Sequence, residues 1–240
     1  MTSLQTLDNI YNLTPVNIGG KSQKNQDFYI DYVFKCVEPI NKFFVEFGAV
    51  DGFQMSNTFW LRRKHKWTGL LLDGFYENSI INLHKKFITK DNIVSIFEEF
   101  NVPEEFDFLS VDLDGMDFYV LESILKKYKP TLIQVETNLR FEPNQSVVIK
   151  YDENWIWDYR SWYGASPLAY KKMTANYGYV PLIMHHDDLF LINEKYASDL
   201  IKNKPWLEIQ PRSNKQIYNT HVGSVGFPKF YFDKNNFTEY

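Results

Sequence analysis

The chain has 240 residues, of which 44% are hydrophobic and 18% aromatic, so it can bury the core of one large domain. Its 26 basic and 30 acidic residues give a net charge of −4, which disfavours non-specific nucleic-acid binding because that binding depends on neutralising phosphates. The single cysteine, Cys36, excludes an intrachain disulfide and a cysteine zinc cluster. The sequence shows no signal-peptide pattern and no apolar run of about 20 residues, so we predict a soluble, cytoplasmic protein without a membrane span.

The elements predicted along the chain alternate between helix and strand. An amphipathic helix is expected from residue 22 to about 37, where Phe28, Tyr32 and Cys36 recur every four residues. The apolar runs predict buried strands at 43–47, 69–73, 92–96, 107–115 and 131–136. Helices are expected between them at about 56–66, from 78 onward, and at 117–127. A Trp-rich loop (140–165), a helix from Ser166-Pro167, an antiparallel hairpin around 185–187 and a helix near 195–203 follow.

This order predicts the fold class. Nearly continuous apolar strands that alternate with helices are typical of a parallel sheet covered on both faces. We therefore predict an α/β protein with a Rossmann-like, doubly wound, mostly parallel sheet and a C-terminal antiparallel hairpin. The predicted parts are an N-terminal extension and helix (1–42), the sheet-containing core (43–193) and a C-terminal extension packed on the core (194–240).

Acidic and amide side chains follow several of the predicted strands directly. Because sheets of this class bind ligands at the carboxyl ends of their strands, these side chains mark a candidate site. The residues concerned are Glu46, Asp51, Asp73, Asp112, Asp114, Glu136 and Asn138.

The stretch FFVEFGAVDG (43–52) indicates which ligand this edge of the sheet accepts. Gly48 and Gly52 allow a sharp turn and a close approach of a ligand to the backbone. The spacing is not the G-x-G-x-x-G of a dinucleotide site, and Glu46 and Asp51 would repel a diphosphate. S-adenosylmethionine, with its sulfonium, ammonium and ribose diol, suits acidic surroundings, and Asp73 is placed to accept from the ribose. An acid at that place also serves NAD, so an NAD-dependent oxidoreductase remains an alternative.

Several ordered segments resemble the FkbM-type methyltransferase family. The similarity extends over residues 22–193 and includes Ser22-Gln23 with Gln26-Asp27, FVEFGAVDG with Ser56-Asn57-Thr58, Trp67–Leu70, LSVDLDGMDFYVLESI, TLIQVETN, Tyr163–Ser166 and Tyr177–Tyr179. The resemblance implies a class I methyltransferase fold, S-adenosylmethionine and O-methylation, often of sugars or secondary metabolites. It differs at Leu72-Asp73-Gly74, where the family often has I-E-P, and residues 194–240 have no counterpart.

With this resemblance, we assign a set of residues to the cofactor site. The set is Glu46, Gly48, Ala49, Asp51, Gly52, Ser56, Asn57, Asp73 and Asp112.

The acceptor side needs a group that takes the proton from the acceptor hydroxyl. In one mechanism Asp114 or Glu136 is the general base, with Asp112 in the same catalytic set. In the other, Asp112, Glu136 and Asn138 hold Mg²⁺ or Mn²⁺, a layout similar to that of catechol O-methyltransferase. Alternatively, Asp114 only caps the next helix and Asp112 only contacts the cofactor.

Three further groups of side chains have a functional and a structural interpretation. His185 and His186 are either bases or exposed residues at a hairpin tip. The aromatic residues of the loop either face a sugar ring or fill the core, and the basic run 62–66 is either a solvated helix face or a contact for a nucleotide-sugar or an anionic glycan. The aromatic residues are Trp155, Trp157, Trp162 and Tyr163.

The leading prediction is a cytoplasmic, S-adenosylmethionine-dependent O-methyltransferase that acts on a hydroxyl of a sugar or glycan, with no nucleic acid as partner. The alternatives are an RNA- or N-directed methyltransferase, a non-catalytic cofactor-binding subunit of a glycan-modifying system, and the oxidoreductase.

Overall fold

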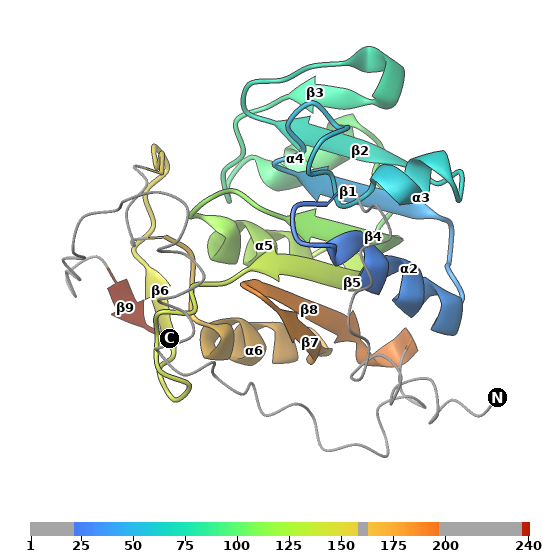
Figure 1. The fold of residues 1–240 in the computed structure, drawn as a ribbon. Helices are drawn as coiled ribbons and strands as arrows, with labels where there is room; N and C mark the ends of the chain where they lie inside the picture. The colour runs from blue at the N-terminus through green and yellow to red at the C-terminus, as the bar shows by residue number, and fades with distance from the viewer. Residues whose placement is uncertain (1–21, 158–162, 197–236) are drawn as a thin grey trace.

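The computed structural model describes residues 22–157, 163–196 and 237–240. Within them, the main sheet has seven strands in the order β3-β2-β1-β4-β5-β8-β7 (Figure 1). The strands are β1 (Phe43–Phe47), β2 (Thr68–Asp73), β3 (Leu83–Lys85), β4 (Glu105–Val111), β5 (Lys129–Glu136), β7 (Tyr179–His185) and β8 (Asp188–Asn193). Neighbouring strands from β3 to β5 are parallel, whereas β8 is antiparallel to both β5 and β7. The predicted Rossmann-like sheet with a C-terminal antiparallel hairpin is therefore confirmed.

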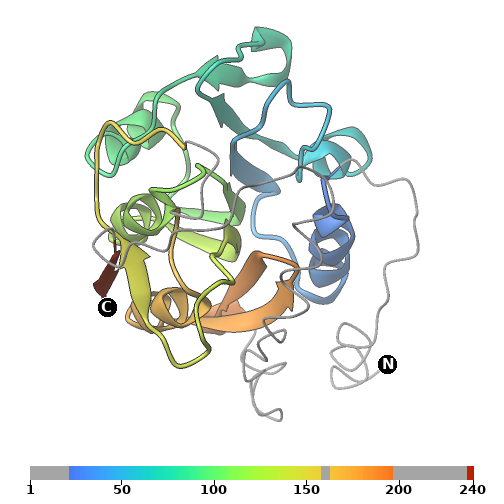
Figure 2. The ribbon, with the colours of Figure 1, turned by 60° about the vertical axis from the view of Figure 1, so that its left-hand side comes forward.

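Helices cover both faces of this sheet (Figure 2). On one face, α2 (Gln26–Cys36) and α3 (Phe59–Arg63) pack on a core that includes Phe44 and Phe108. On the other face, a larger core joins the sheet to α4 (Ile93–Glu99), α5 (Asp117–Leu125) and α6 (Pro167–Ala175). In the described segments, no helix is both long and apolar enough to cross a membrane.

The prediction was wrong for the stretch between residues 78 and 96. Residues 92–96, expected as a strand, belong to α4, and the third strand of the sheet is β3, within the expected helix. That expected helix is reduced to one 3₁₀ turn, η1 (Ser79–Ile81). The reason appears when the run is extended by one residue: Ile93 and Ile96 inside it and Phe97 directly after it are all buried, and their spacing of three and one is that of a helix face.

Other boundaries moved less. The helix expected at 56–66 is α3, with Thr58 at its N-cap position instead of Ser56 or Asn57. The loop at 140–165 contains a short strand, β6 (Val147–Ile149), that pairs with β9 (Phe237–Glu239). Most of the helix expected near 195–203 lies outside the described residues, as does most of the extension 194–240.

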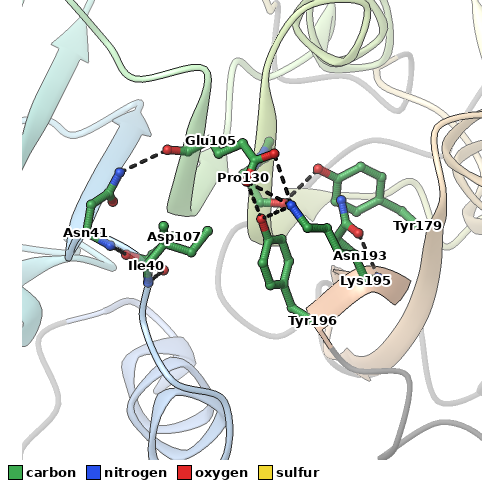
Figure 3. A network of polar contacts seen from close by, with 9 residues as sticks. All are labelled: Ile40, Asn41, Glu105, Asp107, Pro130, Tyr179, Asn193, Lys195 and Tyr196. Carbon is green, nitrogen blue, oxygen red and sulfur yellow. Dashed lines mark hydrogen bonds and ion pairs between the residues drawn. The ribbon is translucent and has the colours of Figure 1, made fainter.

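A polar network stabilises the edge of the sheet formed by the strand ends, on the side where β4 begins (Figure 3). Asp107 is fully buried and accepts hydrogen bonds from three consecutive backbone N–H groups of residues 40–42, at 2.6, 3.0 and 2.6 Å. Beside it, Lys195 Nζ lies 3.0 Å from Glu105 Oε2 at the surface. The candidate site lies at the opposite edge, which is formed by the carboxyl ends of these parallel strands.

Candidate active site

The side chains on the α2 face of the sheet change from apolar to acidic along the strands. The innermost register row consists of aromatic and aliphatic residues, Phe44, Phe108 and Leu132. Two residues further, on the same face, the row is polar but still buried: Glu46, Ser110 and Gln134. Two residues further again, past or at the strand ends, come Gly48, Asp112 and Glu136. The period of two thus brings the predicted acids to one edge.

The three predicted catalytic carboxylates converge at this edge. One carboxylate oxygen from each of Asp112, Asp114 and Glu136 lies within 4.8 Å of the other two. Asp114 is exposed and has a left-handed backbone with φ of 54°, whereas Asp112 and Glu136 are half-buried. A non-glycine residue held in this conformation is uncommon, and strain of this kind is often found at functional sites.

The surroundings of these carboxyl groups favour their protonated forms. Burial and, after it, the charge of Asp114 raise the pKa of Asp112 well above its usual range. Burial and the charge of Asp112 do the same for the pKa of Glu136, and burial raises the pKa of Asp114. The cluster therefore favours the uptake of a proton or the binding of a cation that offsets its negative charge.

The loop that follows β1 has an unusual backbone. Gly48 has φ of 64°, and a Cβ added there would lie 2.5 Å from the carbonyl oxygen of Asp112. The two strand ends therefore approach each other more closely than any side chain at this position would permit. Positive φ recurs through the loop, at Val50, Gly52 and Met55.

Two predicted cofactor residues, Asp73 and Asp51, accept hydrogen bonds from backbone N–H groups of this loop. Asp73, at the end of β2, accepts from the N–H of Val50 at 2.9 Å. Asp51 accepts from Phe53 N and Gln54 N, both at 2.8 Å, and these bonds, that of Gln54 first, lower the pKa of Asp51. Asp73 also accepts from Phe75 N at 2.8 Å and from Tyr76 N at 3.2 Å, so three backbone N–H groups occupy most of the roughly four acceptor positions of its carboxylate.

Other predicted cofactor residues lie beneath the loop, with Ala49 also buried there. Glu46 accepts from Asn57 N at 2.6 Å and from Ser56 Oγ at 2.9 Å, and all three residues are buried. Burial raises the pKa of Glu46, although these hydrogen bonds act in the opposite direction. Glu46, Ser56 and Asn57 thus support the loop from below, while Gly48 is exposed, Asp51 is half-buried and Asp73 is buried at the end of β2.

Asn138, predicted as a metal ligand, has backbone partners in the structure. Its Nδ2 donates to Tyr163 O at 3.1 Å, and its Oδ1 accepts from Arg140 N at 3.1 Å. The structure brings the carboxylates of Asp112, Asp114 and Glu136 together, and Asn138 follows Glu136 by two residues.

The N-terminal segment docks on the hairpin next to this edge. Lys24 Nζ pairs with Asp187, and Gln26 Nε2 donates to Asp188 at 2.8 Å. His185 Nε2 lies 2.6 Å from the carbonyl oxygen of Lys24, so this histidine belongs to the docking contact. Residues 22–27 and the hairpin tip therefore border the acid cluster together, because Glu136 pairs with Asp188 in the sheet.

Aromatic side chains of the loop after β5 also reach the cluster. Trp155 Nε1 donates to the carbonyl oxygen of Asp114 at 3.0 Å, and its indole lies against Gly115. The rings of Trp157 and Tyr163 are in edge contact, with centroids 6.1 Å apart. Trp162 lies outside the described residues.

Sequence reasoning missed two residues that organise the site. Arg62, expected on a solvated helix face, is half-buried and donates to Gly52 O and, at 3.3 Å, to Ser56 Oγ. Gln134 is a buried amide in the middle of β5. For Gln134 a signal existed, since a single polar residue interrupts an apolar strand; for Arg62 its position in a basic run hid its role.

Comparison with known proteins gives a weak structural match and no match by sequence. No family model and no curated protein matches the chain. Among solved structures, one described as "a putative O-methyltransferase from Klebsiella pneumoniae" overlaps at a TM-score of 0.37 and 16% identity, covering 63% of this chain and 70% of the other. An overlap this weak supports no conclusion about activity, so the interpretation depends on the strand order and the described side chains.

Proposed function

We propose that the chain is an S-adenosylmethionine-dependent O-methyltransferase that methylates a hydroxyl group of a sugar or glycan in the cytoplasm. The observation that carries the proposal is the cluster of Asp112, Asp114 and Glu136 at the carboxyl ends of β4 and β5, directly beside Gly48. The antiparallel β8 between β5 and β7 agrees with the class I methyltransferase fold that the sequence resemblance implied.

The residues on the cofactor side fit this cofactor. Gly48 lets the loop after β1 approach the backbone of Asp112 closely, and the carboxylates of Asp51 and Asp73 accept hydrogen bonds from N–H groups of that loop. This donor set lacks an anion cradle and suits a ligand with hydroxyl groups and positive charge. When bound, S-adenosylmethionine supplies an electrophilic methyl group.

In the first mechanism, a carboxylate of the cluster is the general base. Glu136 and Asp114 each have a pKa raised by burial, which makes their ionised forms better proton acceptors than ordinary carboxylates. One of them removes the proton of the acceptor hydroxyl as the oxygen attacks the methyl group. The indole of Trp155, fixed on the backbone of Asp114, offers an aromatic face for a sugar ring beside that carboxylate.

In the second mechanism, a divalent cation lowers the pKa of the hydroxyl. Asp112, Asp114 and Glu136 would hold Mg²⁺ or Mn²⁺ through oxygen atoms, the ligands that both ions prefer. Burial and, after it, the charges of the neighbouring carboxylates raise the pKa values of Asp112 and Glu136, and a bound cation would offset that repulsion.

The test is methyl transfer from labelled S-adenosylmethionine to a panel of neutral sugars, amino sugars and nucleotide-sugars. We expect Asp114→Ala and Glu136→Ala to lower turnover by about 100-fold or more, the usual effect of losing a general base, with unchanged affinity for S-adenosylhomocysteine. Glu99→Ala, which removes an exposed acid on α4, is the matched control. Full activity of both site variants would refute the acceptor-side assignment, and turnover that depends on added Mg²⁺ would favour the second mechanism.

A further inference from the structure

Gln134 is a buried amide whose two chain neighbours in β5 are apolar. It is 1% exposed and lies between Ile133 and Val135, both fully buried. Burying an amide is costly unless its polar atoms are hydrogen-bonded. Here they are bonded, and the partners come from two different parts of the site.

The oxygen of Gln134 is bonded toward the cofactor side. Its Oε1 accepts from Asn57 Nδ2 at 3.0 Å, and also from Ser110 Oγ in the neighbouring strand. Asn57 donates its own backbone N–H to Glu46 at 2.6 Å, so it is part of the buried base of the loop after β1.

The nitrogen of Gln134 is bonded toward the acceptor side. Its Nε2 donates to Asp188 Oδ1 at 2.5 Å. The other oxygen of Asp188 accepts from Gln26, and the preceding residue, Asp187, pairs with Lys24. Asp188 is also the register partner of Glu136. The side chain of Gln134 therefore forms a direct link between the base of the cofactor loop and the tip of the hairpin.

We propose that Gln134 is a positioning residue that couples the loop after β1 to the tip of the β7–β8 hairpin, so that order on one side of the site is transmitted to the other. The names cofactor side and acceptor side depend on the proposed function, whereas the coupling does not. The orientation of the amide permits this coupling. Its Oε1 accepts from Asn57 and its Nε2 donates to Asp188, so one side chain bonds to a group on each side of the strand.

The test is hydrogen exchange in the ligand-free protein, followed at residues 53–58 and at 185–188. In the wild type, Asn57→Ala should speed exchange at the hairpin tip by about tenfold, the effect of losing one buried hydrogen bond. In the Gln134→Met background, which keeps the length of the side chain but has no amide, Asn57→Ala should leave exchange at the tip unchanged. An equal response in both backgrounds, or no response in the wild type, would overturn the proposal.

A donor–acceptor exchange separates coupling from general loss of structure. Gln134→Glu retains an acceptor for Asn57 but places a second carboxylate against Asp188. In this background, Asn57→Ala should no longer speed hydrogen exchange at the hairpin tip. Adding Asp188→Asn supplies an N–H to the introduced carboxylate and leaves an oxygen for Gln26, so the response should return. If the double variant does not restore it, Gln134 has a merely structural role.

A final arm uses S-adenosylhomocysteine as probe. In the wild type it should slow exchange in both segments, and in Gln134→Met only at 53–58; slowing in both segments of that variant would overturn the coupling. If the probe does not bind the wild type at all, the proposed function fails, while the ligand-free comparison still decides the coupling.

Discussion

Among single residues, Gly48 is the one whose replacement should disturb the backbone of the site most directly. It combines φ of 64° with a place where a Cβ would lie 2.5 Å from the backbone oxygen of Asp112. We expect Gly48→Ala to lower the free energy of unfolding by about 2–4 kcal/mol, through left-handed strain and a clash with backbone that cannot move cheaply. Urea denaturation measures the change.

Gly178→Ala is the matched control for this variant. Gly178 has φ of 79°, but a Cβ there would meet no atom within 4 Å. It should therefore show the conformational cost alone, about 1–2 kcal/mol. Equal losses in the two variants would mean that the approach of the two strand ends at Gly48 is not as close as the structure has it.

At the scale of elements, the connection from α2 to β1 depends on one carboxylate. Asp107→Ala would leave three backbone N–H groups of residues 40–42 without their acceptor, in a part of the sheet where Asp107 itself is fully buried. We expect a loss of about 2–4 kcal/mol in the free energy of unfolding, without a change in S-adenosylhomocysteine affinity.

Glu105→Ala, two residues earlier on the same strand, serves as the comparison for Asp107. The pair of Glu105 with Lys195 is solvent-exposed, so its loss should change the free energy of unfolding by less than about 1 kcal/mol. A large effect at Glu105 with none at Asp107 would contradict the account of this edge.

The elements also show where sequence reasoning succeeds. Runs such as GLLLD and TLIQVE are apolar on both faces and end in acids, so they predicted both the buried strands and the site edge. The run NIVSI is similarly apolar, but Phe97, which completes the buried helix face with Ile93 and Ile96, lies just outside it. Short apolar runs cannot separate strand from buried helix, and β3, with only three residues, gives almost no pattern of its own.

At the scale of the whole molecule, the site is assembled from segments far apart in the sequence. The loop after β1, the ends of β4 and β5, the hairpin tip and residues 22–26 meet at one edge (Figure 1). The sequence predicted which strand ends would meet, because parallel topology brings their carboxyl ends together. It could not predict that Arg62 and Gln134 hold the loops, because such contacts depend on side-chain directions that arise only on folding.

The central claim is that this edge binds S-adenosylmethionine, and isothermal titration calorimetry tests it most directly. S-adenosylmethionine and S-adenosylhomocysteine are titrated into the wild type and into Gly48→Ala, with and without Mg²⁺, and NAD is the control ligand. The account predicts micromolar binding of the first two to the wild type, much weaker binding to Gly48→Ala, and no binding of NAD. Binding of NAD in place of S-adenosylhomocysteine would contradict it.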